Sequence, residues 1–143
     1  MLFLCHNIFL SKIMSIKRKI YITIWITYIL AILYLSFANF SSYDNSISIE
    51  IPYVDKVVHF MMYFFLSMLG MIYLYRTKTT IKKKIWYFLF VIFLGIIIEF
   101  FQPFFERGFE VLDMVADIIG AVTAWIIISY FLGNNKNKLE KKF

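Results

Sequence analysis

Four apolar stretches of the chain are each long enough to cross a membrane as a helix. They cover residues 20–37, 55–75, 85–101 and 111–132, and polar segments separate them. A hydrocarbon core of about 30 Å needs roughly 20 apolar residues in helical form, which each stretch approaches or exceeds. Pro103 is expected to end the third helix, because the residue before a proline disfavours helical geometry. The pattern predicts an all-α integral membrane bundle of four transmembrane helices.

The two ends of the chain are not expected to cross the membrane, because the apolar run in residues 1–13 is too short and the tail is polar. Residues 1–19 form a cytoplasmic segment before the first helix. Met14 is a candidate start that would make residues 1–13 an over-extended reading of the gene, and the alternative is that residues 1–13 are an ordinary flexible N-terminus. The basic, Asn-rich tail 133–143 is expected to be disordered. No internal repeat or linker is apparent in 143 residues, so residues 20–132 are predicted to form one membrane domain.

The distribution of charge predicts which helix ends lie in the cytoplasm. From Lys17 onward, twelve Lys and Arg residues lie before the first helix, between the second and third, and in the tail, whereas only Lys56 and Arg107 lie on the opposite side. Eight of the nine acids lie on that opposite side, which includes the polar loop 38–54. Basic short loops stay cytoplasmic. Both termini are therefore expected to be cytoplasmic, with the two acidic loops outside.

Composition narrows the class of protein further. The chain is 62% hydrophobic and contains 17 Phe, which is more apolar surface than a soluble domain of this size can hide. The single cysteine, Cys5, excludes an internal disulfide and a multi-cysteine metal site. The net charge of +6 comes from topology clusters rather than from an aromatic-lined basic groove, so nucleic acid is not an expected partner. The lipid bilayer is the expected partner, and composition specifies neither a cofactor nor an oligomeric state.

Polar side chains interrupt the apolar pattern at one end of three helices. A charge among apolar residues usually marks a function or a necessary internal pairing. Asp55 and His59 are four residues apart and share a helix face, and the same spacing relates Asp113 to Asp117. His59, Glu99 and Asp117 each lie about one helical turn inside the membrane end of their helices, so these three side chains are expected at one depth. The ligand-binding candidates are Asp55, Lys56, His59, Tyr63, Glu99, Gln102, Arg107, Asp113 and Asp117, and the catalytic candidates among them are Glu99, Asp117, His59 and Asp113.

Small residues lie on the same helix faces as these polar groups. Small residues spaced four apart allow helices to approach closely in lipid. The polar faces are therefore expected to turn toward the interior of the bundle. The candidates for helix packing are Gly70, Gly95, Ala116, Gly120 and Ala124.

Several polar residues also have simpler interpretations. Asp55 and Asp113 are plausible caps of the second and fourth helices. His59, as a lone histidine at a helix end, could be a capping or packing group. Lys56 could extend to the lipid headgroups. Arg107 could pair with an acid of its own loop, Glu106 or Glu110. Glu99 and Asp117 lie deeper in their helices, where exposure to solvent is a poor explanation for a charged side chain. These two acids indicate a buried polar network.

The spacing of the polar residues is similar to that of a known family. The pattern is Asp55-Lys56-x2-His59-Phe60-x2-Tyr63-x2-Leu66, then Glu99-x2-Gln102, then Arg107-x5-Asp113-x3-Asp117-x2-Gly120. It resembles the VanZ-like family of small bacterial membrane proteins, whose founding member is associated with resistance to the glycopeptide teicoplanin. The resemblance implies a multi-pass protein of the bacterial cytoplasmic (inner) membrane. Where the family often has Asn, this chain has an acid, Asp117, so a strictly amide-dependent role does not carry over.

Three functions of different classes fit these residues. The first is an outward-facing polar site that binds or modulates a cell-envelope component or an envelope-targeting glycopeptide antibiotic. The second is a membrane-embedded acid–base or metal-assisted enzyme acting on a lipid-linked envelope substrate. The third is a structural subunit of a membrane complex. No nucleophile motif or established metal-ligand spacing is present, so no metal site is assigned and the binding hypothesis ranks first.

Overall fold

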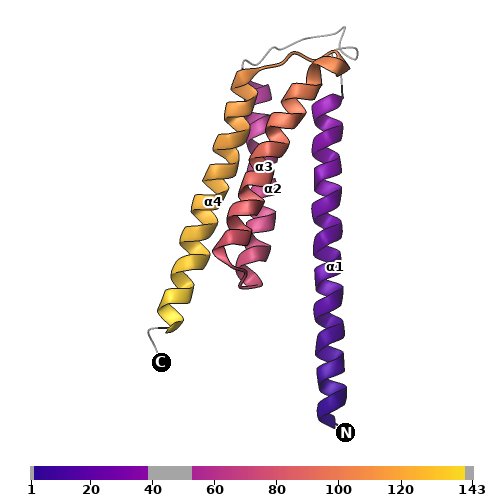
Figure 1. Cartoon of the computed structure of the whole chain (residues 1–143), viewed down its shortest axis with the longest axis vertical. Helices are drawn as coiled ribbons and strands as arrows, with labels where there is room; N and C mark the ends of the chain where they lie inside the picture. The colour runs from indigo at the N-terminus through magenta and orange to yellow at the C-terminus, as the bar shows by residue number, and fades with distance from the viewer. Residues whose placement is uncertain (1, 39–52, 141–143) are drawn as a thin grey trace.

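The chain folds into four long α-helices that run along one another (Figure 1). The structure is a computed structural model that describes residues 2–38 and 53–140, with side chains for 16–38 and 53–133. No strand occurs in the described residues, so the predicted all-α class is confirmed. The helices are α1 (Leu2–Phe37), α2 (Val54–Arg76), α3 (Ile81–Phe101), the short 3-10 helix η2 (Gln102–Phe105) and α4 (Val111–Glu140).

All four α-helices contain a segment that is long and apolar enough to cross a membrane. Many of their Ile, Leu, Val and Phe side chains are exposed on the outside of the bundle, where lipid can cover them. The beginning of α1 and the end of α4 lie at the same end of the molecule (Figure 1). These features confirm a four-helix membrane bundle. The four segments are Ile16–Phe37, Val54–Arg76, Ile81–Phe105 and Val111–Gly133.

Two helices begin earlier than their apolar patterns predict. α1 begins at Leu2 rather than at residue 20, because residues 2–19 contain neither proline nor glycine and continue the helix. α3 begins at Ile81 rather than at residue 85, since the intervening lysines are good helix formers. Hydrophobicity marks the part of a helix that lipid covers, and the helix itself continues beyond that part.

The last helix is also longer than predicted. α4 continues through Glu140, so most of the tail 133–143 is helical where a disordered tail was expected. Lys, Leu and Glu in this segment favour helix, and the single glycine at its start does not end it. Residues 141–143 and most of the predicted polar loop 38–54 lie outside the described residues.

Close approach of the helices brings their polar faces together. α2 packs most extensively against α4, and α3 packs against both. A Cβ added at Gly120 would overlap the backbone carbonyl oxygen of Phe60, so glycine permits this approach of α4 to α2. A Cβ at Gly95 would lie 2.9 Å from Asp117 Oδ2 and 3.1 Å from Tyr63 Cε1, so side chains of α4 and α2 pack directly against the backbone of α3 at this glycine. Of the other predicted packing residues, Gly70 and Ala124 are buried and Ala116 is partly buried.

Aromatic side chains hold α1 against the other helices. Trp25 donates a hydrogen bond from Nε1 to the hydroxyl of Tyr87, at 3.2 Å. The Tyr28 hydroxyl donates to the backbone carbonyl of Met62, also at 3.2 Å. Ile32 is 1% exposed and belongs to the core shared by the helices. α1 is therefore positioned by long side chains rather than by close backbone approach.

Candidate functional site

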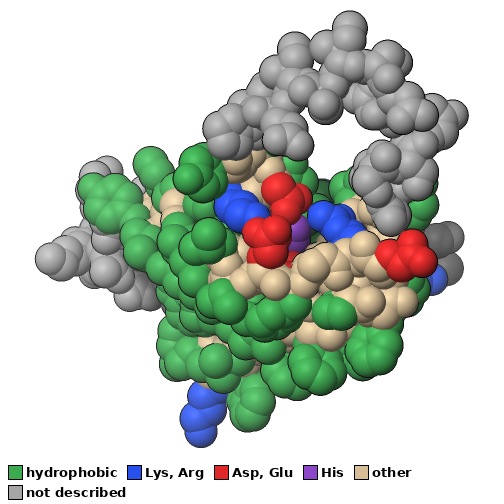
Figure 2. Space-filling model, turned by 90° about the horizontal axis from the view of Figure 1, so that it is seen from above, with side chains coloured by type: hydrophobic (Ala, Val, Ile, Leu, Met, Phe, Trp, Pro, Cys, Tyr) green, Lys and Arg blue, Asp and Glu red, His purple; other side chains and the backbone are tan. Residues whose placement is uncertain are grey.

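The polar stretches meet at the end of the bundle where α2 and α4 begin and α3 ends. Viewed from this end, acidic and basic side chains and a histidine gather in one patch with hydrophobic side chains around it (Figure 2). All four catalytic candidates are almost fully buried: His59, Glu99, Asp113 and Asp117. Helix geometry explains the meeting, because each residue lies within about one or two turns of the same end of its helix.

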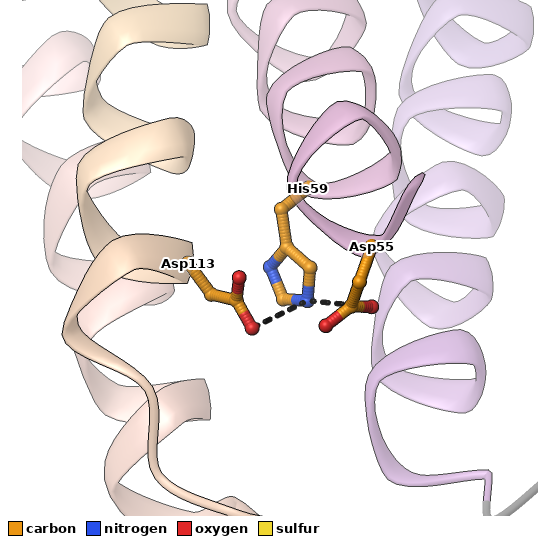
Figure 3. Close-up of side chains that lie close together, drawn as sticks. All are labelled: Asp55, His59 and Asp113. Atoms are coloured by element: carbon orange, nitrogen blue, oxygen red, sulfur yellow. Dashed lines mark ion pairs between the residues drawn. The ribbon is translucent and has the colours of Figure 1, made fainter. Parts of the chain in front are cut away.

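His59 lies at the centre of the site, and its two ring nitrogens face different acids. Nδ1 lies 3.1 Å from Asp117 Oδ1 and 3.5 Å from Glu99 Oε1. Nε2 lies 3.9 Å from Asp113 Oδ2 and 4.0 Å from Asp55 Oδ1 (Figure 3). One imidazole therefore connects carboxyl groups from α2, α3 and α4.

The residues on the Nδ1 side, together with the histidine itself, form the inner layer of the site: His59, Glu99 and Asp117. Glu99 is 0% exposed and Asp117 is 3% exposed. Among the described residues, neither carboxylate oxygen of Glu99 has a hydrogen-bond partner, and Oδ2 of Asp117 has none. No described Lys or Arg lies within 4.0 Å of either acid. A buried carboxylate without partners is costly, so the inner layer has bonding capacity that the described protein groups do not satisfy.

Lys56 organises the rim layer, which comprises Asp55, Lys56, Arg107, Glu110 and Asp113. Its Nζ lies 2.8 Å from Asp113 Oδ1 and 3.7 Å from Asp55 Oδ2. It also forms a salt bridge with Glu110. Lys56, for which headgroup contact was one interpretation, thus links the start of α2 to the start of α4. The fixed positive charge of this amine lies on the outer side of the histidine.

Arg107 fastens the end of α1 to the site. Its Nη1 donates to the backbone carbonyls of Leu35, at 3.1 Å, and Ser36, at 3.2 Å. Its Nη2 donates to Asp55 Oδ1 at 3.5 Å. Gln102 Nε2 donates to the same Ser36 carbonyl at 3.4 Å. The interpretation that Arg107 pairs with an acid of its own loop is therefore wrong, because its guanidinium reaches α1 and α2 instead.

Tyr63 lies one turn further along α2 from His59 and faces the interior. It is 1% exposed, and its hydroxyl has no hydrogen-bond partner among the described residues. Gln102 is also 1% exposed. The structure thus brings all nine ligand-binding candidates to one end of the bundle. Of the four candidates on α2, Tyr63 lies furthest from the start of the helix and Asp55 is the most exposed.

Some contacts of the site were not predicted. Asp55 does not cap α2, because the cap position is Tyr53 and no side chain bonds there. Glu110 was not predicted as a partner of Lys56. Its position directly before α4, close in sequence to Asp113, could have indicated that it lies near the start of α2. Ser36 was not predicted because it contributes its backbone carbonyl, and every residue type has the same carbonyl group.

The chemistry open to the site follows from its donor atoms. Two trios bring ligand atoms within 4.8 Å of one another, one formed by Asp55, His59 and Asp113 and the other by the inner layer. Imidazole nitrogens and carboxylate oxygens are ligands of divalent metals, and the same groups serve in acid–base catalysis. The sequence predicted that the inner-layer residues lie at one depth, but it did not assign a metal site to either trio, because the ligand atoms of each come from more than one helix.

Comparison with known proteins places the chain in a family. The VanZ/LLP1 family model matches residues 1–132. The match covers most of the chain and includes all of the polar stretches described above, which confirms the resemblance inferred from residue spacing. No curated protein and no solved structure matches the chain. The chain is a multi-pass membrane protein and belongs to the VanZ/LLP1 family.

Proposed function

We propose that this protein binds a polar group rich in hydroxyl or ammonium donors at the outer face of the cytoplasmic membrane. Through this binding it modulates a cell-envelope component. The observation that carries the proposal is the gathering of five carboxyl groups and two permanent cations at one end of an apolar bundle. Charge in a membrane segment is costly and usually marks a function. The groups are Asp55, Glu99, Glu110, Asp113 and Asp117, with Lys56 and Arg107.

Loop charge supports an outward orientation of the site. Three basic segments lie at or just beyond the ends of the apolar spans opposite the site, and the positive-inside rule assigns such segments to the cytoplasm. Both termini would then be cytoplasmic, in the cytoplasmic membrane of a bacterium. A ligand would approach the rim layer from the outer leaflet.

Exposure within the rim layer favours donors over anions as ligands. The side chains of Asp55 and Glu110 are 46% and 51% exposed, whereas those of Lys56 and Arg107 are 21% and 24% exposed. Both cations are already paired with carboxylates or carbonyl oxygens. Carboxylates accept hydrogen bonds from hydroxyl and ammonium groups. The rim layer therefore suits sugars and amino sugars better than phosphate.

Exposed apolar side chains close to the site in the sequence favour a ligand with a lipid part. Phe104, Phe100 and Leu112 are 74%, 64% and 59% exposed and flank the site in the sequence. A lipid chain held against them would bury apolar surface, while its headgroup reached the acids. Two sources share this chemistry: a lipid-linked saccharide of the envelope and an amphiphilic glycopeptide antibiotic such as teicoplanin.

Binding to protein in lipid nanodiscs tests the proposal. The two probes are a polyprenyl-linked saccharide and teicoplanin, each measured separately. Asp55→Asn and Glu110→Gln should each weaken binding about tenfold, since a hydrogen bond to a charged group contributes about 1.5 kcal/mol. Glu106→Gln is the matched control, because it removes the same charge from an exposed position of the same loop.

The outcomes separate the two sources. Binding of the saccharide alone identifies an envelope component as the ligand, and binding of teicoplanin alone identifies the antibiotic. The proposal is refuted if folded protein binds neither probe, or if Glu106→Gln weakens binding as much as Glu110→Gln does.

A second candidate function is an acid–base or metal-assisted enzyme acting on a lipid-linked envelope substrate. The observation that favours it is the hydrogen-bonding distance of 3.1 Å between His59 Nδ1 and Asp117 Oδ1, a pairing found in general bases. His59 is 2% exposed and Glu99 0% exposed, so a substrate reaches them only when the rim layer opens. Turnover that disappears in Glu99→Gln supports this candidate, and binding without turnover opposes it.

A further inference from the structure

We propose that the inner layer binds one divalent transition-metal ion, held by Nδ1 of His59 and by the carboxylates of Glu99 and Asp117. The ion would lie between α2, α3 and α4, about one helical turn inside the rim layer. This inference is independent of the ligand proposed for the rim layer, because it concerns different side chains and different atoms of the histidine.

The spacing of the inner-layer atoms fits a metal ion. Nδ1 of His59 lies 3.1 Å from Asp117 Oδ1 and 3.5 Å from Glu99 Oε1, and the three ligand atoms all lie within 4.8 Å of one another. Ligands about 2.05 Å from a metal are about 3.3 Å apart in a tetrahedron and about 2.9 Å apart in an octahedron. Small rotations of the two carboxyl groups therefore give a coordination sphere.

Unsatisfied bonding capacity is the second observation, and it is independent of the spacing. Glu99 is 0% exposed, and neither of its carboxylate oxygens has a hydrogen-bond partner among the described residues, although Oε1 lies 3.5 Å from the imidazole. Oδ2 of Asp117 is likewise buried without a partner among these residues. Two carboxylates in one buried layer need positive charge or protons. A divalent cation supplies that charge and the missing bonds together.

The outer trio of acids and histidine does not compete for the ion. Lys56 Nζ lies 2.8 Å from Asp113, and Arg107 Nη2 lies 3.5 Å from Asp55, so both carboxylates already face a fixed positive charge. These charges would repel a cation on the Nε2 side of His59. The two acids instead lie behind the imidazole, where carboxylates orient a metal-bound histidine.

The donor set indicates the class of metal. Imidazole nitrogen suits Zn²⁺, Fe²⁺ and similar ions, and carboxylate oxygen suits Mn²⁺ and harder ions. One nitrogen and two carboxylates thus favour Zn²⁺ or Mn²⁺ over Ca²⁺. Three protein ligands also leave at least one coordination position open, as in metal sites that bind a further group.

Metal content of the purified full chain tests the proposal. The protein is purified in detergent without a polyhistidine tag, stripped with a chelator, and loaded with Zn²⁺ or Mn²⁺ before desalting and elemental analysis. Wild type should retain about one ion per chain, since the geometry provides one three-ligand site. Glu99→Gln and Asp117→Asn should each lower the affinity at least tenfold, while the exposed control Glu106→Gln retains it.

Thermal unfolding distinguishes a metal site from a structural network. Added metal should raise the Tm of wild type by several degrees and leave that of Glu99→Gln unchanged, because an ion that binds only the folded state stabilises it. Bound Co²⁺ should give visible absorption bands that His59→Gln abolishes.

Two results would overturn the proposal. The first is folded wild type that retains neither Zn²⁺ nor Mn²⁺ at millimolar concentration and shows no change in Tm. The second is a Glu99→Gln variant that binds and responds to metal as wild type does. Because Glu99→Gln keeps the shape of the side chain and removes a buried charge, we expect it to fold. If it does not, the stoichiometry and Co²⁺ spectrum of wild type and His59→Gln still decide the question.

Discussion

Lys56 pairs with three acids, and the two nearest, Asp113 and Glu110, differ in burial, so removal of the lysine should affect these two differently. The side chain of Asp113 is 3% exposed, whereas that of Glu110 is 51% exposed, and both pair with the same amine. Lys56→Met removes the charge and keeps most of the apolar stem. The variant leaves the buried carboxylate of Asp113 without its lysine partner, while water can solvate Glu110.

The expected strength of each pair follows from its surroundings. Two unit charges 2.8 Å apart interact with a gross energy of about 6 kcal/mol at an effective dielectric constant of about 20. Desolvation offsets much of this energy, so we expect a coupling of about 2–3 kcal/mol between Lys56 and Asp113. The pair with Glu110 is exposed and should couple by at most about 1 kcal/mol.

Two double-mutant cycles measure these couplings. One combines Lys56→Met with Asp113→Asn, and the other combines Lys56→Met with Glu110→Gln. Unfolding by sodium dodecyl sulfate in mixed micelles, followed by circular dichroism, gives the free energy of unfolding of each variant. In the first cycle, Asp113→Asn should restore most of the stability that Lys56→Met loses.

The reasoning from burial is refuted by either of two results. One is a coupling to Glu110 that equals or exceeds the coupling to Asp113. The other is a coupling to Asp113 below about 0.5 kcal/mol in protein that unfolds cooperatively, since additivity within that range means no interaction.

Three further substitutions test the approach of α4 to α2, the attachment of α1 to the site, and the backbone between α2 and α3 at the opposite end of the bundle. Gly120→Leu should lower the free energy of unfolding by about 1–3 kcal/mol because its Cβ would overlap the Phe60 carbonyl oxygen, and an unchanged value in the detergent titration would contradict this close approach. Arg107→Lys should raise hydrogen exchange at the end of α1 about tenfold, because lysine cannot reproduce the guanidinium contacts to two carbonyls; unaltered exchange there would oppose that role. Lys78→Gly should raise stability by about 0.5–1 kcal/mol, since Lys78 has φ 52°, and a lower Tm would refute it.

The fold was predictable from hydrophobic runs because lipid imposes one strong constraint on each span. Backbone groups in a hydrocarbon core must bond within the helix, so each apolar run had to be helical. The same constraint says nothing about helix ends that extend into water. This explains why α1 begins at Leu2 and α4 continues to Glu140, beyond the predicted limits. Helix propensity governs those extensions, and it varies weakly among Lys, Asn and Leu.

The inner layer was predictable, and much of the rim layer was not. His59, Glu99 and Asp117 lie inside helices, where fixed rise and rotation determine depth and direction. Their meeting could be inferred from loop charge, helical spacing and the small residues on the same helix faces. Lys56 and Arg107 have long side chains with many rotamers, and their partners Glu110 and Asp55 lie near helix ends or in loops. No periodicity determines which of several nearby acids such a side chain contacts.

The imidazole of His59 makes the two layers of the site depend on each other. A cation on Nδ1 requires that nitrogen to be unprotonated, so the ring proton must be on Nε2, facing Asp113 and Asp55. The Nε2–H group is then a hydrogen-bond donor directed at Asp113 and Asp55. It competes with Lys56 and Arg107 for the carboxylate oxygens of these two acids. A ligand at the rim that draws Asp55 away from Nε2 would, by linkage, alter the affinity of the inner layer for its ion by the same factor that the ion alters binding at the rim. The geometry of one ring thus provides a physical route for coupling between a surface ligand and a buried cation.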